Sequence, residues 1–179
     1  YLCRKLIDAY EKCRDSVSWM YPDAKTQITV YYNEKGVPEN IPYVVFSLNH
    51  CDEVSLKEVK EGFHSIVFPL FLESLESDKR CLFTSETEFM INFSGEWHIG
   101  GPKADAGLTG RKIVGDQYGP DCPIGGGAFS GKDPTKVDRS AAYMARYIAK
   151  NIVHVGLAKE ATVQLSYLIG RKDPVSFCV

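Results

Sequence analysis

The sequence lacks a long apolar run and a strong excess of charge of either sign. The longest apolar run, residues 66–72, is interrupted by Pro69 and is far shorter than the roughly 20 residues of a membrane-spanning helix. The 21 basic and 23 acidic residues leave a formal net charge of −2, which gives no global electrostatic attraction to nucleic acid. We therefore expect no membrane and no nucleic-acid partner, and any phosphate chemistry must come from a local cluster of basic residues.

Paired cysteine and histidine motifs are also absent. The six cysteines are scattered and never form a C-x-x-C pair, which favours reduced thiols in a cytoplasmic protein over a disulfide framework. The four histidines show no paired spacing, so a structural zinc site is not expected and we interpret them as surface or packing residues. No targeting segment is visible. The sequence starts without methionine inside a helical pattern and stops within a strand pattern, so we expect a fragment of a longer protein.

The remaining composition, 44% hydrophobic and 25% charged, is that of an ordinary globular chain. Apolar spacing predicts a helix over 2–14, and alternation predicts strands over 26–32 and 43–48. A charged helix over about 55–77, opened by a capping box of Ser55 and Glu58, precedes a short strand over 88–92. This β-β-α-β order predicts an α+β fold with helices packed on one face of a sheet.

Glycine divides the chain, because 11 of its 15 glycines lie within residues 95–131. This stretch retains aromatic and aliphatic side chains, so we interpret it as an ordered, functional loop system rather than disorder. A narrow apolar stripe then predicts a helix over 137–155, ended by Gly156 and followed by strands over 161–167 and 175–179. We expect an α+β unit over 1–94, a glycine-rich loop segment over 95–137, and the start of a further unit over 138–179.

The most specific string is GGGAFSGKD at residues 125–133. Glycines let backbone N–H groups approach a phosphate, and Lys132 and Lys136 can neutralise its charge. The string nearly fits the P-loop pattern, but Asp133 stands where a hydroxyl should meet Mg²⁺, and Pro134 follows where a helix should begin. A P-loop-like hydrolase is therefore disfavoured, and a plain glycine-rich connector is the alternative to a phosphate site.

A second basic cluster lies upstream, in GLTGRK at residues 107–112. It puts Arg111 and Lys112 at the expected start of a short helix. Arginine offers a planar fork to phosphate oxygens and lysine a point charge. The two segments could hold a triphosphate if they converge, although each cluster alone is more often a solvated face.

From residue 95 to residue 179 the chain closely resembles S-adenosylmethionine synthetase, also called methionine adenosyltransferase. The strings GGGAFSGKD, GLTGRK and KVDRSAAY match that family in order and spacing, and PDAKTQIT at residues 22–29 is similar to the segment before the family's catalytic lysine strand. The resemblance covers nearly the whole chain and about half of a typical member. The family's GHPDK-type segment, its GAGDQG hexapeptide and its C-terminal portion are not in this sequence, so we expect the isolated chain to be inactive.

The resemblance implies repeated β-α-β-β-type units, with mixed sheets, helices packed on one face and a sheet face used for dimerisation. It implies a cytoplasmic transferase that forms S-adenosylmethionine from ATP and L-methionine, with Mg²⁺ and K⁺ as cofactors and release of phosphate and diphosphate. It further implies a homodimer or a dimer of dimers with the active site at the subunit interface. A non-catalytic regulatory or scaffold relative is the alternative.

The resemblance also implies residue roles: catalysis by Lys25, Arg111 and Lys132; ATP and triphosphate binding by Asp23, Trp97, Arg111, Lys112, Lys132 and Lys136; methionine binding by Asp105 and Lys136; and metal binding by Asp138. Structural alternatives are a helix N-cap for Asp138, an exposed strand position for Lys25 and core packing for Trp97. Trp97 stands where the family usually has a phenylalanine that stacks on adenine. Glu96 stands where the family usually has arginine, and Phe93-Ser94 replaces a Pro-Thr pair. A carboxylate beside a nucleotide is unfavourable, so we expect Glu96 to lower the affinity for ATP.

Overall fold

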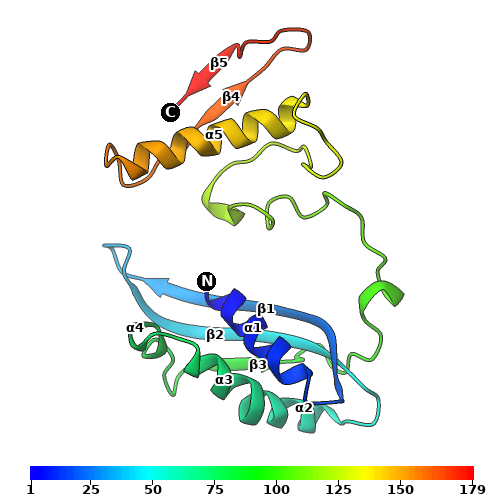
Figure 1. Cartoon of the computed structure of the whole chain (residues 1–179). Coiled ribbons are helices and arrows are strands. Elements are labelled where there is room, and N and C mark those ends of the chain that lie inside the picture. Colours follow the sequence, from blue (N-terminus) through cyan, green and yellow to red (C-terminus); the bar gives the residue numbers. More distant parts are fainter. The chain divides into compact units, whose positions relative to one another are not determined.

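The computed structural model describes residues 1–179, apart from the side chain of Pro120. The chain divides into two compact units, Tyr1–Ala106 and Gly107–Val179, which are described separately (Figure 1). The fold is α+β, as the sequence pattern predicts. No helix in the described part of the chain is long and apolar enough to cross a membrane, and the six cysteines are free thiols.

A mixed sheet forms the scaffold of the first unit. Strand β1 (Met20–Tyr32) pairs antiparallel with β2 (Pro38–His50), and β2 pairs parallel with β3 (Glu88–Ile91). The predicted strands 26–32 and 43–48 are too short, because ladder pairing continues through register shifts where the side-chain alternation breaks. The connecting turn depends on Gly36, whose φ of 73° lies in the left-handed region that glycine enters without a steric penalty.

Helices cover one face of this sheet. Val44, Phe46 and Leu48 of β2 alternate with half-buried or exposed neighbours and point into the core. Helix α1 (Leu2–Arg14), which is confirmed as predicted, adds Leu6 and Tyr10 to the same core. The helical segments after β2 complete it with a row of side chains: Val59, Phe63, Val67 and Phe71.

The helix predicted over about 55–77 is confirmed as a continuous helical run over 56–73, but it contains a π-helical turn that was not predicted and it ends early. Its capping box is confirmed. Ser55 N donates to Glu58 Oε2 at 2.9 Å, and Glu58 N donates to Ser55 Oγ at 3.4 Å. Helix α2 (Leu56–Gly62) then passes through a π-helical turn, η1 (Phe63–Val67), into α3 (Phe68–Glu73), and α4 (Ser77–Arg80) is separate. Pro69 accounts for the irregular turn, because its nitrogen has no hydrogen for the carbonyl four residues earlier.

The second unit contains one long helix and a small hairpin. Helix α5 (Val137–His154) confirms the predicted helix to within one residue, and Gly156 follows it with a φ of 77°. Strands β4 (Gln164–Ser166) and β5 (Ser176–Cys178) pair antiparallel and are shorter than predicted. Figure 1 shows α5 running beside this hairpin.

The short helix predicted at Arg111 is wrong. Residues 113–118 form turns in which Asp116 N donates to Lys112 O and Gly119 N to Val114 O, each at 2.9 Å. Glycines lower the helical propensity of this stretch, and an α-helix cannot continue through Gly119, whose φ is 60°. The 3₁₀ turns η2 (Gly101–Lys103) and η3 (Gly119–Asp121) are the regular elements of the glycine-rich segment.

Candidate functional site

The first group of predicted site residues lies near the start of β1. The carboxylate of Asp23 accepts a hydrogen bond from Gly101 N at 2.7 Å. The ammonium of Lys25 lies 5.7 Å from the centre of a Trp97 ring, which is within cation–π range. A Cβ on Gly100 would stand 2.8 Å from the Asn49 side chain and 3.0 Å from Asp23 Cβ. Only glycine lets the segment after Trp97 lie this closely against β1 and β2.

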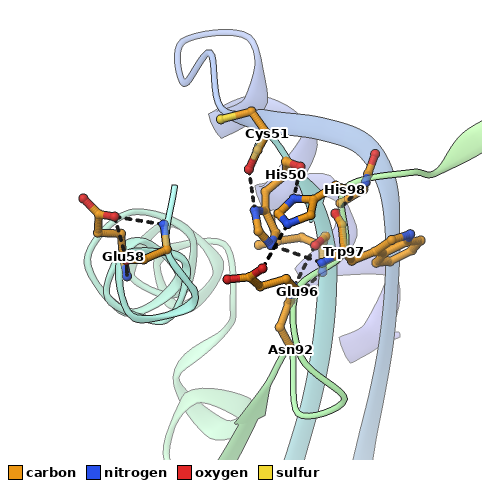
Figure 2. Close-up of polar contacts among 10 residues, drawn as sticks. His50, Cys51, Glu58, Asn92, Glu96, Trp97 and His98 are labelled. Carbon is orange, nitrogen blue, oxygen red and sulfur yellow. Dashed lines mark hydrogen bonds and ion pairs between the residues drawn. The ribbon is translucent and has the colours of Figure 1, made fainter. Parts of the chain in front are cut away.

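Two buried polar residues at the end of β2 hold this segment, and Figure 2 shows one of them, His50, beside Trp97. Asn49 is 4% exposed and His50 is fully buried. Trp97 O accepts from His50 N at 2.9 Å and from Asn49 Nδ2 at 2.7 Å. The His50 ring adds a further bond, because its Nε2 lies 3.3 Å from Trp97 N. The interpretation of the histidines as packing residues is therefore incomplete for His50, whose ring and backbone both bind the segment.

His98 and Glu96 form a pair on either side of Trp97. His98 Nε2 lies 3.1 Å from Glu96 Oε2, and His98 Nδ1 lies 3.3 Å from His50 O. The hydrogen bond that His98 donates to Glu96 is the main cause that raises the pKa of His98 above its usual 6.5. Figure 2 shows the rings of His50 and His98 next to each other, while the Trp97 side chain extends away from both.

The second group of predicted residues gathers at the N-terminal end of α5. Lys132 Nζ lies 3.2 Å from Asp138 Oδ2, and the guanidinium of Arg139 donates to Lys132 O. A Cβ on Gly127 would stand 2.5 Å from Asp138 Oδ2 and 2.7 Å from Asp138 Cβ. The glycine string therefore lies against the first turn of α5, with a lysine and a carboxylate beside it.

Lys136 is the N-cap of α5, so the interpretation of Asp138 as the N-cap is wrong; Asp138 lies in the first turn. Asp133 organises the approach to the helix by accepting from Thr135 N at 2.8 Å and from the Thr135 hydroxyl. These hydrogen bonds lower the pKa of Asp133. Within the described residues no side chain caps this helix start, so the partial positive charge of its N–H groups adds to that of the lysines and favours an anion.

The two basic motifs meet within the second unit. Gly110, with a φ of 80°, lies so close to Ala128 that a Cβ on Gly110 would overlap the methyl group of Ala128. Arg111 and Lys112 follow at once and are exposed, and Lys112 Nζ donates to Arg111 O at 3.4 Å. Turns and Pro134, rather than a strand and an immediate helix, flank the glycine string, which excludes P-loop geometry.

The predicted site residues thus fall into two groups, one in each unit. Asp23, Lys25 and Trp97 lie together in the first unit. Asp105 belongs to the same unit, is exposed, and its backbone N donates to Gly101 O at 3.0 Å. The second unit holds the phosphate candidates: Arg111, Lys112, Lys132, Lys136 and Asp138.

The residues around Asp138 fit a magnesium ion that arrives with a polyphosphate. Across the described residues, no three histidine, cysteine or acidic side chains gather as a metal cluster. Magnesium in phosphate sites is held by one or two carboxylates together with substrate phosphates and water. A single carboxylate, 57% exposed and beside Lys132, meets that requirement. We assign no residue to potassium.

Sequence reasoning missed several residues that organise the site: Asn49, His50, His98 and Arg139. One signal was present at the end of β2, where two polar residues interrupt a hydrophobic strand. Buried polar side chains are uncommon and are normally hydrogen-bonded. The motif at residues 136–143 contains Arg139, but nothing in the motif indicates that its guanidinium binds Lys132 O.

Comparisons with known proteins identify the family. Residues 1–97 match the family described as S-adenosylmethionine synthetase, central domain, and residues 99–179 match the C-terminal domain of the same family. The S-adenosylmethionine synthase of Petrotoga mobilis is 46% identical over 176 residues, which are 98% of this chain and 42% of the relative. The chain therefore spans less than half the length of that relative. On these matches, the chain belongs to the S-adenosylmethionine synthetase family.

Proposed function

We propose that the chain carries adenosine- and triphosphate-binding parts of a methionine adenosyltransferase. This transferase forms S-adenosylmethionine from ATP and L-methionine and releases phosphate and diphosphate. The observation that carries the proposal is the group at the start of α5. There the glycine string, Lys132, Lys136 and the N–H groups of the helix bring positive charge and hydrogen-bond donors together. Two carboxylates lie beside them, Asp138 at 3.2 Å from Lys132 Nζ and Asp133 at 3.9 Å from Lys136 Nζ.

The reaction requires stabilisation of a polyphosphate leaving group. The thioether sulfur of methionine attacks C5′ of the ribose, the C5′–O bond breaks, and its electron pair leaves with the triphosphate, which is then hydrolysed. Lys132, Lys136, Arg111 and Lys112 are suited to neutralise the charge that develops on the triphosphate. Magnesium bound to Asp138 would supply further charge neutralisation on the phosphates.

The first unit would bind the rest of the substrates. The Trp97 indole offers a face on which adenine can stack, while Asp23 would contact the adenosine and Lys25 the ribose and triphosphate oxygens. Asp105 would bind the methionine ammonium and Lys136 also its carboxylate. Glu96 lies next to Trp97, and its pairing with His98 reduces the repulsion that its carboxylate would exert on ATP.

The sheet face opposite the core is the candidate dimer interface. It presents cross-strand pairs such as Thr29–Tyr43 and Tyr43–Glu88, and Tyr31 and Tyr43 are 53% and 40% exposed. Aromatic side chains are enriched at interfaces between subunits.

We further propose that the protein contains repeated units of this type and forms a homodimer or a dimer of dimers with the active site between subunits. We also propose a cytoplasmic location and potassium as a second cofactor.

A non-catalytic scaffold relative is the competing function, and product formation separates the two. The protein expressed from its complete gene is incubated with ATP, L-methionine, Mg²⁺ and K⁺, and S-adenosylmethionine is measured by chromatography. We expect product from that protein and none from the 179-residue chain alone. Absence of product from the complete protein at saturating substrates would favour the scaffold.

A further inference from the structure

The segment that carries Trp97 has no regular structure of its own. The described backbone of residues 95–100 belongs to neither helix nor strand, so side chains from elsewhere must fix its position. Trp97 nevertheless makes backbone hydrogen bonds in both directions. Its N–H faces His50 Nε2, and its carbonyl accepts from His50 N and from Asn49 Nδ2.

The hydrogen bonds of His50 define one tautomer. Nδ1 lies 2.8 Å from Cys51 O, and a carbonyl oxygen only accepts, so Nδ1 carries the hydrogen. The neutral ring then leaves Nε2 as an acceptor for Trp97 N–H at 3.3 Å. Because the ring is fully buried, neither nitrogen can exchange its partner for water without opening the structure.

These contacts also orient the Trp97 ring. The indole Nε1 donates to Ile99 O at 2.9 Å, and Lys25 Nζ lies 5.7 Å from a ring centre. Further along, Gly101 N is held by Asp23. The segment is therefore anchored at Trp97 and at Gly101, so the backbone that carries the indole is held on β2 while the contacts with Ile99 O and Lys25 hold the ring.

We propose that His50, assisted by Asn49, is a positioning residue that fixes Trp97 for stacking on the adenine base. This inference rests on the proposed function, in which Trp97 binds adenine. An indole that is already ordered loses less conformational freedom when a base stacks on it, so affinity rises without any direct contact between His50 and the nucleotide. His50 acts through Trp97 and takes no part in the chemistry.

Amide hydrogen exchange in the full 179-residue chain, measured by NMR, tests the positioning directly. His50→Leu removes the acceptor while it keeps a buried apolar group, and His50→Gln restores an acceptor near the position of Nε2. The matched control is His64→Leu, because His64 is exposed on η1. Exchange of the Trp97 amide is compared with that of Leu48, whose amide is bound to Asn92 Oδ1 at 2.9 Å and reports on the stability of the sheet.

Relative to Leu48, the Trp97 amide is expected to exchange about tenfold faster in His50→Leu, and within about twofold of wild type in His50→Gln and His64→Leu. Equal acceleration at both amides would show a purely structural role and overturn the inference. If His50→Leu does not fold, Asn49→Ala gives the same test through the Trp97 carbonyl. We expect its effect on the Trp97 amide to be smaller, because His50 N still donates there.

Calorimetric titration with ATP separates this inference from the proposed function. If the protein from the complete gene binds ATP, His50→Leu should weaken binding about tenfold and His50→Gln should restore it. Unchanged affinity in His50→Leu would overturn the positioning role. If wild type binds no ATP while the exchange pattern holds, the proposed function fails and the anchoring of Trp97 by His50 stands.

Discussion

His98 and Glu96 are joined through His98 Nε2 and Glu96 Oε2, 3.1 Å apart, while His98 Nδ1 faces the carbonyl of His50. Both partners are acceptors, so the imidazolium, which has two N–H donors, satisfies both contacts. The pair lies in the segment where the sequence departs from the family pattern through Glu96. The carboxylate of Glu96 therefore comes with its own counter-charge, which would limit its effect on a nucleotide bound as we propose.

The first prediction concerns the pH dependence of stability. The pKa of His98 is raised above 6.5, chiefly by Glu96 and with a contribution from Asp52. Stability from a raised pKa is fully present below the unfolded pKa and is lost as pH rises through the folded pKa. The free energy of unfolding should therefore fall more between about pH 6 and about pH 9 in wild type than in Glu96→Gln.

Histidine NMR titration and denaturant unfolding at the two pH values check this prediction. The matched control is Glu86→Gln, because Glu86 is an exposed glutamate in a loop of the same unit, and it should leave the titration of His98 unchanged. A wild-type His98 that titrates at or below 6.5, the value from which its shift is measured, would contradict the ion pair.

The second prediction concerns the glycine string. Gly127→Ala places a methyl group 2.5 Å from Asp138 Oδ2 and 2.7 Å from Asp138 Cβ, so the string must move away from α5. We expect a loss of about 1–3 kcal/mol in the stability of the second unit and weaker binding of inorganic triphosphate. Gly125→Ala is the control, because nothing lies within 4 Å of its new methyl group. Equal stability of the two variants in denaturant titrations would show that the close approach does not exist in solution.

The third prediction separates charge from shape at the candidate metal ligand. Asp138→Asn removes a negative charge beside Lys132. In calorimetric titrations, the variant should bind metal-free triphosphate about threefold to tenfold more tightly than wild type and the magnesium complex more weakly. Asp173→Asn, at an exposed position near β5, should change neither. The same response to magnesium in both variants would remove Asp138 from the metal site.

The sequence predicts those features of the structure that follow from a pattern repeated over several neighbouring residues. Helix α5 and the capping box at Ser55 follow from local spacing and were predicted. The π-helical turn was not, because a single residue, Pro69, changes hydrogen bonding within an otherwise helical pattern.

The same distinction holds in the site. The strings that contain Lys132 and Arg111 identified the phosphate candidates. The contacts of His50 could not be predicted from the sequence, because its partner Trp97 lies 47 residues away. His50 becomes part of the site only in the folded protein, where its buried ring lies next to Trp97.

The formation rate of S-adenosylmethionine by the complete gene product, with and without Lys132, tests the central claim most directly. Lys132→Ala removes the ammonium beside Asp138 and should slow product formation by about a hundredfold or more, in line with about 2.7–4 kcal/mol for the loss of one charge-stabilising donor. Lys159→Ala, at an exposed position after α5, should keep the wild-type rate. If both variants formed product within about twofold of the wild-type rate, the assignment of the residues at the start of α5 to the triphosphate site would be contradicted.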